Sequence, residues 1–184
     1  MNKKIIIFLL LLFFSISFVY ADKLFFTEFG LGYASIISPG NIENNTTGTK
    51  DTMAIDAKAG INILKWVDIY AAGSFYFFMF NQDWQSHYSF YPIAGGVRIN
   101  ILSENLIYPD LFFEYGVAIS NLHTIFTDSP WTAQYYNFGI SVNLNITDIS
   151  NISLKIERPT ISGKDETQPE IHIIKTSLAW KFYY

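Results

Sequence analysis

Residues 53–63 read MAIDAKAGINI, with an apolar residue at every odd position. The even positions between them include Asp56 and Lys58, which are charged. Successive side chains of a β-strand point to opposite faces, so this alternation predicts a strand with one apolar face and one charged face. The fold class then depends on which of the two faces meets the solvent.

The same two-residue period recurs along the chain, in blocks that are separated by clusters of Gly, Pro, Asn, Asp, Ser and Thr. It predicts eight strands, near residues 24–37, 53–64, 67–80, 88–102, 110–122, 133–145, 151–159 and 170–184. The longer or more polar connections are 38–52, 81–87, 123–132 and 160–169, and they alternate with short turns. Long loops at one end and tight turns at the other are typical of outer-membrane barrels.

The two faces of these strands differ in charge. One face is apolar, and the stretches assigned to it, such as Ile152, Leu154 and Ile156 in the seventh strand, contain no charged residue. The opposite face carries ten charges: Glu28, Asp56, Lys58, Asp68, Arg98, Glu114, Lys155, Glu157, Lys175 and Lys181. Charges are costly toward lipid but tolerable inside a barrel when they are paired. A lipocalin-like barrel or a two-layer sandwich would instead turn them to water, so the uniformly apolar face favours a membrane barrel.

The first residues have the layout of a secretory signal peptide. Lys3 and Lys4 precede an uncharged apolar run over 5–14, and the small residue Ala21 comes before Asp22. The run is short for a transmembrane helix, which needs about 20 apolar residues. We therefore expect a cleaved signal peptide over 1–21 and one barrel domain over 22–184.

Composition excludes several classes of function. The chain has a net charge of −4 and no basic cluster, which argues against nucleic acid as a partner. It has no cysteine, so neither a disulfide framework nor a thiolate site is available. His123 and His172 lack a metal-ligand spacing. We expect no metal and no other cofactor.

Residues 174–184 read IKTSLAWKFYY, with apolar or aromatic side chains at every second position up to the last residue. This segment resembles the C-terminal assembly signal of outer-membrane barrels, and Leu178, Trp180, Phe182 and Tyr184 carry the resemblance. With the eight predicted strands, the chain resembles the small OmpA/OmpX-type barrels, without a peptidoglycan-binding domain. The resemblance implies an all-β, eight-stranded, antiparallel up-and-down transmembrane β-barrel in the bacterial outer membrane. Its partners would be outer-membrane lipid and the barrel assembly machinery.

An eight-stranded barrel is just wide enough for side chains to fill it. The inward register adds bulky rings to the ten charges, namely Tyr70, Tyr76, Phe78, Phe112, Tyr135 and Tyr183. Inward glycines, such as Gly96 and Gly139, would make room for those rings. We therefore predict a plugged polar interior with an ion-pair network, and the alternative is a narrow gated channel.

Aromatic residues near the strand ends have two interpretations. Trp66, Tyr108, Trp131, Trp180 and Tyr184 fit the interfacial girdles of such barrels. Trp84, His87, Tyr88 and Trp131 could instead form a surface that binds an unknown extracellular ligand, because loops usually carry function on such scaffolds. The predicted role is therefore structural, or one of surface interaction through the outer loops.

A lipid A-modifying enzyme is a less favoured possibility. His87 and Ser89 faintly resemble the His-x-Ser of lipid A deacylase barrels, but Phe90 follows where that family usually has Asn. A nucleophilic serine needs a base and a third group that orients the base. The outward face of the neighbouring predicted strands offers His87 no carboxylate, so we expect no enzymatic activity.

Overall fold

The structure is a computed structural model that describes residues 24–39, 51–79, 87–123, 128–163 and 170–184. The predicted signal peptide lies outside these residues. Within the described part of the chain, no helix is long and apolar enough to cross a membrane. Eight strands make up almost all of it.

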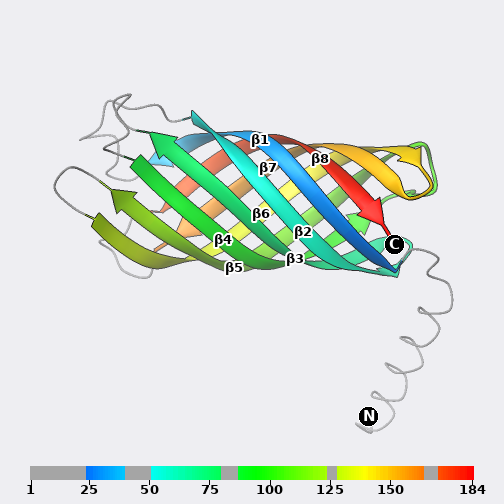
Figure 1. Cartoon of the computed structure of the whole chain (residues 1–184), viewed down its shortest axis with the longest axis horizontal. Coiled ribbons are helices and arrows are strands. Elements are labelled where there is room, and N and C mark those ends of the chain that lie inside the picture. Colours follow the sequence, from blue (N-terminus) through cyan, green and yellow to red (C-terminus); the bar gives the residue numbers. More distant parts are fainter. Residues whose placement is uncertain (1–23, 40–50, 80–86, 124–127, 164–169) are drawn as a thin grey trace, which may run out of the picture.

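The eight strands form one closed barrel in which every strand is antiparallel to its neighbours (Figure 1). Their bounds are β1 Phe25–Pro39, β2 Asp51–Leu64, β3 Val67–Met79, β4 His87–Asn100, β5 Ile107–His123, β6 Asp128–Thr147, β7 Ser150–Ser162 and β8 Ile171–Tyr183. The barrel closes where β8 pairs with β1, from Phe26↔Tyr183 onward. The predicted all-β, up-and-down barrel is confirmed.

The two ends of the barrel differ, as the connection lengths predicted. Short turns join β2 to β3, β4 to β5 and β6 to β7. The C-terminus and the beginning of β1 lie at this same end (Figure 1), which we call the turn end. At the other end, the loop end, β1, β3, β5 and β7 finish.

Several strands are longer than the alternation predicts, and the largest difference is at the start of β6. The predicted strand begins at residue 133, whereas β6 begins at Asp128 and pairs with β5 as far as His123↔Asp128. Backbone pairing in a barrel continues wherever the neighbouring strand supplies partners, whatever the side-chain pattern. Trp131, which the prediction placed in a loop, therefore lies inside a strand.

The outward face forms an apolar belt of large exposed side chains. Phe29 and Ile93 are each 60% exposed, and Leu178 is 58% exposed. The stretches predicted to form this face carry no charge, but the outward position that follows Ile156 does. Arg158 lies on the outward face of β7 and is exposed.

Glycines leave room for rings inside the barrel, as the sequence predicts. A Cβ atom added to Gly96 would lie 2.5 Å from Cζ of Tyr70 and 2.8 Å from its hydroxyl oxygen. A Cβ atom at Gly139 would collide with the ring of Phe112. Tyr70 pairs with Gly96 across β3–β4, and Phe112 pairs with Gly139 across β5–β6, so each ring lies over the glycine opposite it on the neighbouring strand.

Gly96→Ala is expected to lower the free energy of unfolding by about 1–3 kcal/mol, the usual cost of overpacking a core. The matched control is Gly95→Ala, because a Cβ atom at Gly95 meets nothing within 4 Å. Urea titration of the folded barrel in lipid vesicles, followed by tryptophan fluorescence, measures both variants. Equal unfolding midpoints for the two variants would contradict the packing of Tyr70 against Gly96.

Candidate functional site

A first set of interior ion pairs is centred on Glu28 and Arg98. Arg98 Nη2 donates to Glu28 Oε2 at 2.7 Å, and Lys155 Nζ contacts the other oxygen of the same carboxylate. Lys181 Nζ donates to Asp68 Oδ2 at 2.6 Å, and Arg98 Nη1 lies 3.6 Å from that oxygen. All five side chains are buried. They come from five different strands, so these ion pairs connect β1, β3, β4, β7 and β8 inside the barrel.

A second set of ion pairs lies in the same interior. Lys58 forms an ion pair with Glu114, which places β2 against β5 across the lumen. Lys175 Nζ lies 2.8 Å from each oxygen of Asp56 and 3.1 Å from Glu157 Oε1. The ten charges predicted to face inward are thus all buried in the structure, each with an oppositely charged partner.

Two polar residues complete this network. Nδ2 of Asn137 donates to Glu114 at 3.0 Å and to Glu157 at 2.9 Å, which bridges two carboxylates of the second set. Asp110 is 1% exposed, and its Oδ2 lies 3.6 Å from Nε of Arg98. Among the described residues, the interior therefore holds six acids and five bases rather than five of each. Asp110 shares the even register of Glu114 on β5, and that shared register was the signal that could have revealed it.

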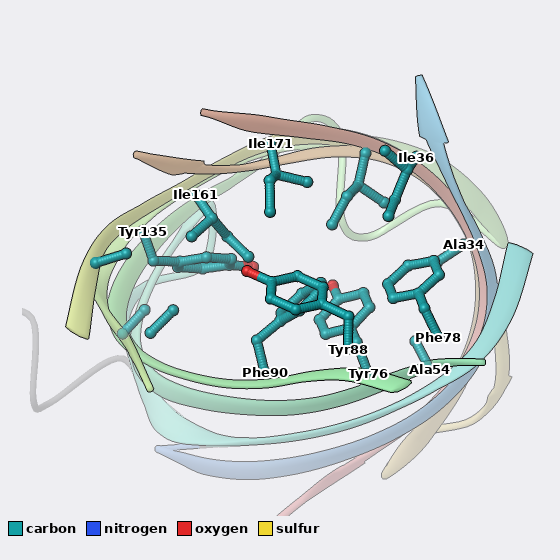
Figure 2. Packing of buried hydrophobic residues seen from close by; sticks show 14 residues of the cluster. Ala34, Ile36, Ala54, Tyr76, Phe78, Tyr88, Phe90, Tyr135, Ile161 and Ile171 are labelled. Carbon is teal, nitrogen blue, oxygen red and sulfur yellow. The ribbon is translucent and has the colours of Figure 1, made fainter. Parts of the chain in front are cut away.

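The loop-end half of the interior is mainly apolar, so the predicted polar character belongs to the section of the lumen that holds the ion pairs. Fourteen buried residues form one cluster there: Ala34, Ile36, Ala54, Tyr76, Phe78, Tyr88, Phe90, Ala94, Ala118, Ala133, Tyr135, Ile161, Ile171 and Ile173. The rings of Tyr76 and Phe90 are stacked with centroids 4.5 Å apart, and Phe78 stacks on Phe90 at 5.7 Å. Figure 2 shows these rings projecting into the lumen from the neighbouring strands β3 and β4, with Tyr135 extending toward them from another part of the wall. Large side chains therefore occupy this section.

A third layer lies at the turn end and consists of tyrosine and asparagine. Asn151 Nδ2 donates to the hydroxyl of Tyr108 at 2.7 Å and to that of Tyr183 at 3.2 Å. The hydroxyls of Tyr108 and Tyr183 lie 3.4 Å apart. Tyr108 is only 2% exposed, so it belongs to the interior and not to the outer girdle in which it was predicted.

The predicted loop-recognition residues do not form one surface. Tyr88 is 2% exposed inside the barrel, so it is corrected to an interior position, whereas Trp131 is partly buried and packs against the apolar cluster. His87 is half-buried, and its ring lies 4.7 Å from that of Phe77. Trp84 lies outside the described residues. Ser89 is 3% exposed, which leaves little access to its hydroxyl.

Three of the predicted assembly-signal residues, Leu178, Trp180 and Phe182, lie on β8, which closes the barrel by pairing with β1, and Tyr184 follows β8 directly. Leu178, Trp180 and Tyr184 are exposed on the outer surface, and the rings of Trp180 and Phe182 stack at 5.4 Å. Trp66 is also exposed, at 53%, in the turn between β2 and β3. These positions place aromatic side chains around the turn end.

One surface ion pair lies at the turn end, outside the apolar belt. Lys65 Nζ donates to Glu104 Oε1 at 2.8 Å, and both side chains are exposed. This hydrogen bond holds the pKa of the Glu104 carboxyl below its ordinary value. Exposed pairs of this kind contribute little to stability.

The outer surface carries one polar cluster toward the loop end of β6, β7 and β8. The hydroxyl of Tyr136 donates to Glu170 Oε1 at 3.0 Å, and Nε2 of His172 lies 3.7 Å from the same oxygen. Oγ1 of Thr160 and Nδ1 of His172 are 3.1 Å apart. Arg158 lies on the outward face of β7 below Thr160. Sequence reasoning missed this cluster, because its members come from three strands and share no motif.

Comparison with known proteins supports the fold. No protein-family model and no curated protein matches the sequence. Neisserial surface protein A superposes with a TM-score of 0.69 at 12% identity, covering 87% of this chain and 97% of that one. Ail of Yersinia pestis gives 0.54 at 10% identity, covering 86% and 98%. The N-terminal barrel of Pseudomonas aeruginosa OprF gives 0.51 at 11%, covering 85% and 97%. The predicted likeness to small outer-membrane barrels is confirmed as a likeness of fold.

Proposed function

We propose that this chain is an integral protein of the bacterial outer membrane, with a plugged interior and a structural or surface-interaction role. The observation that carries the proposal is the reversal of the usual burial pattern. Large apolar side chains cover the outside, whereas ten paired charges lie inside. Such an exterior is unfavourable in water and suits lipid. The fold shared with outer-membrane barrels supports the same placement.

In this placement the loop end faces the outside of the cell and the turn end faces the periplasm. The signal peptide over 1–21 would direct export, and β8 would present Leu178, Trp180, Phe182 and Tyr184 to the barrel assembly machinery. The unknown extracellular ligand would then meet the loops that join the strands at the loop end. One neighbour, Ail, has a structure in complex with a heparin analogue, which illustrates ligand binding on this fold.

The packed interior favours a plug over the alternative of a narrow gated channel. Three layers succeed one another along the lumen: aromatic rings at the loop end, ion pairs in the middle, and tyrosines with asparagines at the turn end. An enzymatic role is not favoured, because the ring of the outward His87 packs against Phe77 in a tilted contact and Ser89 is buried.

Refolded protein is expected to give no discrete conductance steps in a planar lipid bilayer. The physical reason is that ions would have to displace the stacked rings of Tyr76, Phe78 and Phe90. Membrane insertion is checked first, because a folded barrel migrates differently from boiled protein on a denaturing gel. Reproducible openings that change in Arg98→Ala would show that the charged interior is a gate. Identical gel bands, with the protein soluble in the periplasm, would overturn the membrane placement itself.

A further inference from the structure

Arg158 is a charged side chain at the edge of the apolar belt. On β7 it follows Ile156, which is 55% exposed, on the outward face, and it pairs across β6–β7 with Phe138, which is 57% exposed. Its chain neighbour Glu157 points inward and is buried. In the placement proposed above, the guanidinium of Arg158 lies at a lipid-facing position toward the outer leaflet.

This guanidinium has no carboxylate partner among the residues that the structure describes. All the described interior acids are paired with other bases, and Glu170 is contacted by Tyr136 and His172. A charge at a lipid-facing position is unfavourable unless it reaches water or a counterion. An arginine at this position is therefore stabilised if the membrane around it supplies an anion.

We propose that Arg158 binds the phosphate of a lipid headgroup in the outer leaflet. The planar guanidinium presents paired N–H donors that match phosphate oxygens. Ile156 and Leu154 continue the same surface toward the turn end, and Phe138 lies beside Arg158 on β6. All three are exposed, so they give the acyl chains of that lipid an apolar wall. The proposal rests on the membrane placement and adds to it one defined lipid-binding position.

The competing explanation is an arginine that merely extends its charged group to water along the apolar surface. The two explanations differ in what they require of the lipid. A water-facing arginine would not select for phosphate, whereas an anion-binding arginine would. A pair of lipids with the same acyl chains and different headgroups separates them.

The experiment titrates the folded barrel in detergent with dimyristoylphosphatidylglycerol or with dimyristoylglycerol, and native mass spectrometry measures the bound lipid. We expect the wild type to bind the phosphate-bearing lipid, and Arg158→Gln to bind it about ten- to a hundredfold more weakly, as the loss of a charge-assisted hydrogen bond predicts. Arg158→Lys should retain part of the affinity. Ile119→Gln is the matched control, because Ile119 is 50% exposed on the outward face of β5 and lies outside the proposed lipid position. It places the same amide on the outer surface and should bind like the wild type.

Two results would overturn the inference while leaving the membrane placement intact. One is equal phosphatidylglycerol affinity for the wild type and Arg158→Gln, with both proteins heat-modifiable on the gel. The other is equal binding of dimyristoylglycerol and phosphatidylglycerol by the wild type. If no variant and no wild type becomes heat-modifiable in lipid, the membrane placement fails and the inference falls with it. The gel thus identifies which of the two proposals is wrong.

Discussion

Replacing Glu28 with glutamine is expected to lower the free energy of unfolding by about 3–5 kcal/mol, which is the usual effect of removing one partner from a buried ion pair. Glu28 is 1% exposed and accepts from both Arg98 and Lys155. The amide keeps the size of the side chain but leaves the ammonium of Lys155 without its carboxylate. Arg98 still has Asp68 and Asp110 at 3.6 Å, so the loss falls mainly on Lys155.

If the loss of stability in Glu28→Gln comes from the unpaired ammonium of Lys155, removing that ammonium as well should restore stability. In the double variant Glu28→Gln/Lys155→Met no uncompensated ammonium remains, so it should recover much of the lost stability. Glu104→Gln is the control for the substitution itself, because it breaks the exposed pair with Lys65 and should leave the unfolding midpoint nearly unchanged. Urea unfolding in lipid vesicles measures all three. If Glu28→Gln behaves like Glu104→Gln, the interior network does not stabilise the barrel.

The direction in which each side chain faces, inward or outward, follows from the two-residue period and could be predicted from the sequence. The alternation in β2 assigns Asp56 and Lys58 to one face and Ile55 to the other, and the structure has Asp56 and Lys58 buried and Ile55 55% exposed. A register slip of one residue would turn every charge toward lipid, so the period specifies the register strongly. Eight strands with this period leave few alternatives to a closed barrel.

The two-residue period does not show how far a strand extends beyond the apolar belt. It also does not show which side chains fill the lumen at each level along the barrel axis. Trp131 falls in the predicted loop over 123–132, yet β6 begins at Asp128 and turns Trp131 toward the apolar cluster. Tyr88 stands at the start of a predicted strand as a candidate for loop recognition, yet it is 2% exposed inside the barrel. Arg158 lies within the predicted strand over 151–159, but the apolar stretch assigned to the outward face of that strand ends at Ile156, one outward position earlier. The strand ends are set by pairing with neighbours, which a single strand's pattern does not contain.

The apolar cluster shows a second limit of the sequence. Tyr76, Phe90 and Tyr135 occupy the same inward register as the charges, so the alternation groups them with a polar interior. They lie together because the barrel brings β3, β4 and β6 to one height near the loop end. The shift in register between neighbouring strands determines the level along the barrel axis at which each residue lies. No local sequence motif indicates this shift.

Leu154→Arg is expected to prevent most of the protein from folding into lipid vesicles. Leu154 is 56% exposed in the middle of the outward face of β7, between Ile152 and Ile156, and pairs with Val142 and Leu178 on either side. Arginine at the centre of a lipid-facing barrel surface costs about 2–4 kcal/mol. That cost is a large part of the 5–15 kcal/mol by which typical domains are stable.

The next residue along the chain, Lys155, shows that β7 accepts a positive charge on its inward face. The expected loss of folding in Leu154→Arg would therefore come from placing the charge on the outward face. Lys155 is a buried cation that contacts Glu28 in the interior, whereas an arginine at Leu154 would point into lipid among Val142 and Leu178. Leu154→Met is the control, because it keeps an apolar side chain of similar volume and should fold like the wild type. The folded fraction is read from the heat-modifiable gel band after dilution from urea into vesicles. Equal folded fractions for Leu154→Arg and Leu154→Met would mean that this face does not meet lipid, because only a water-exposed surface would accept the charge without loss.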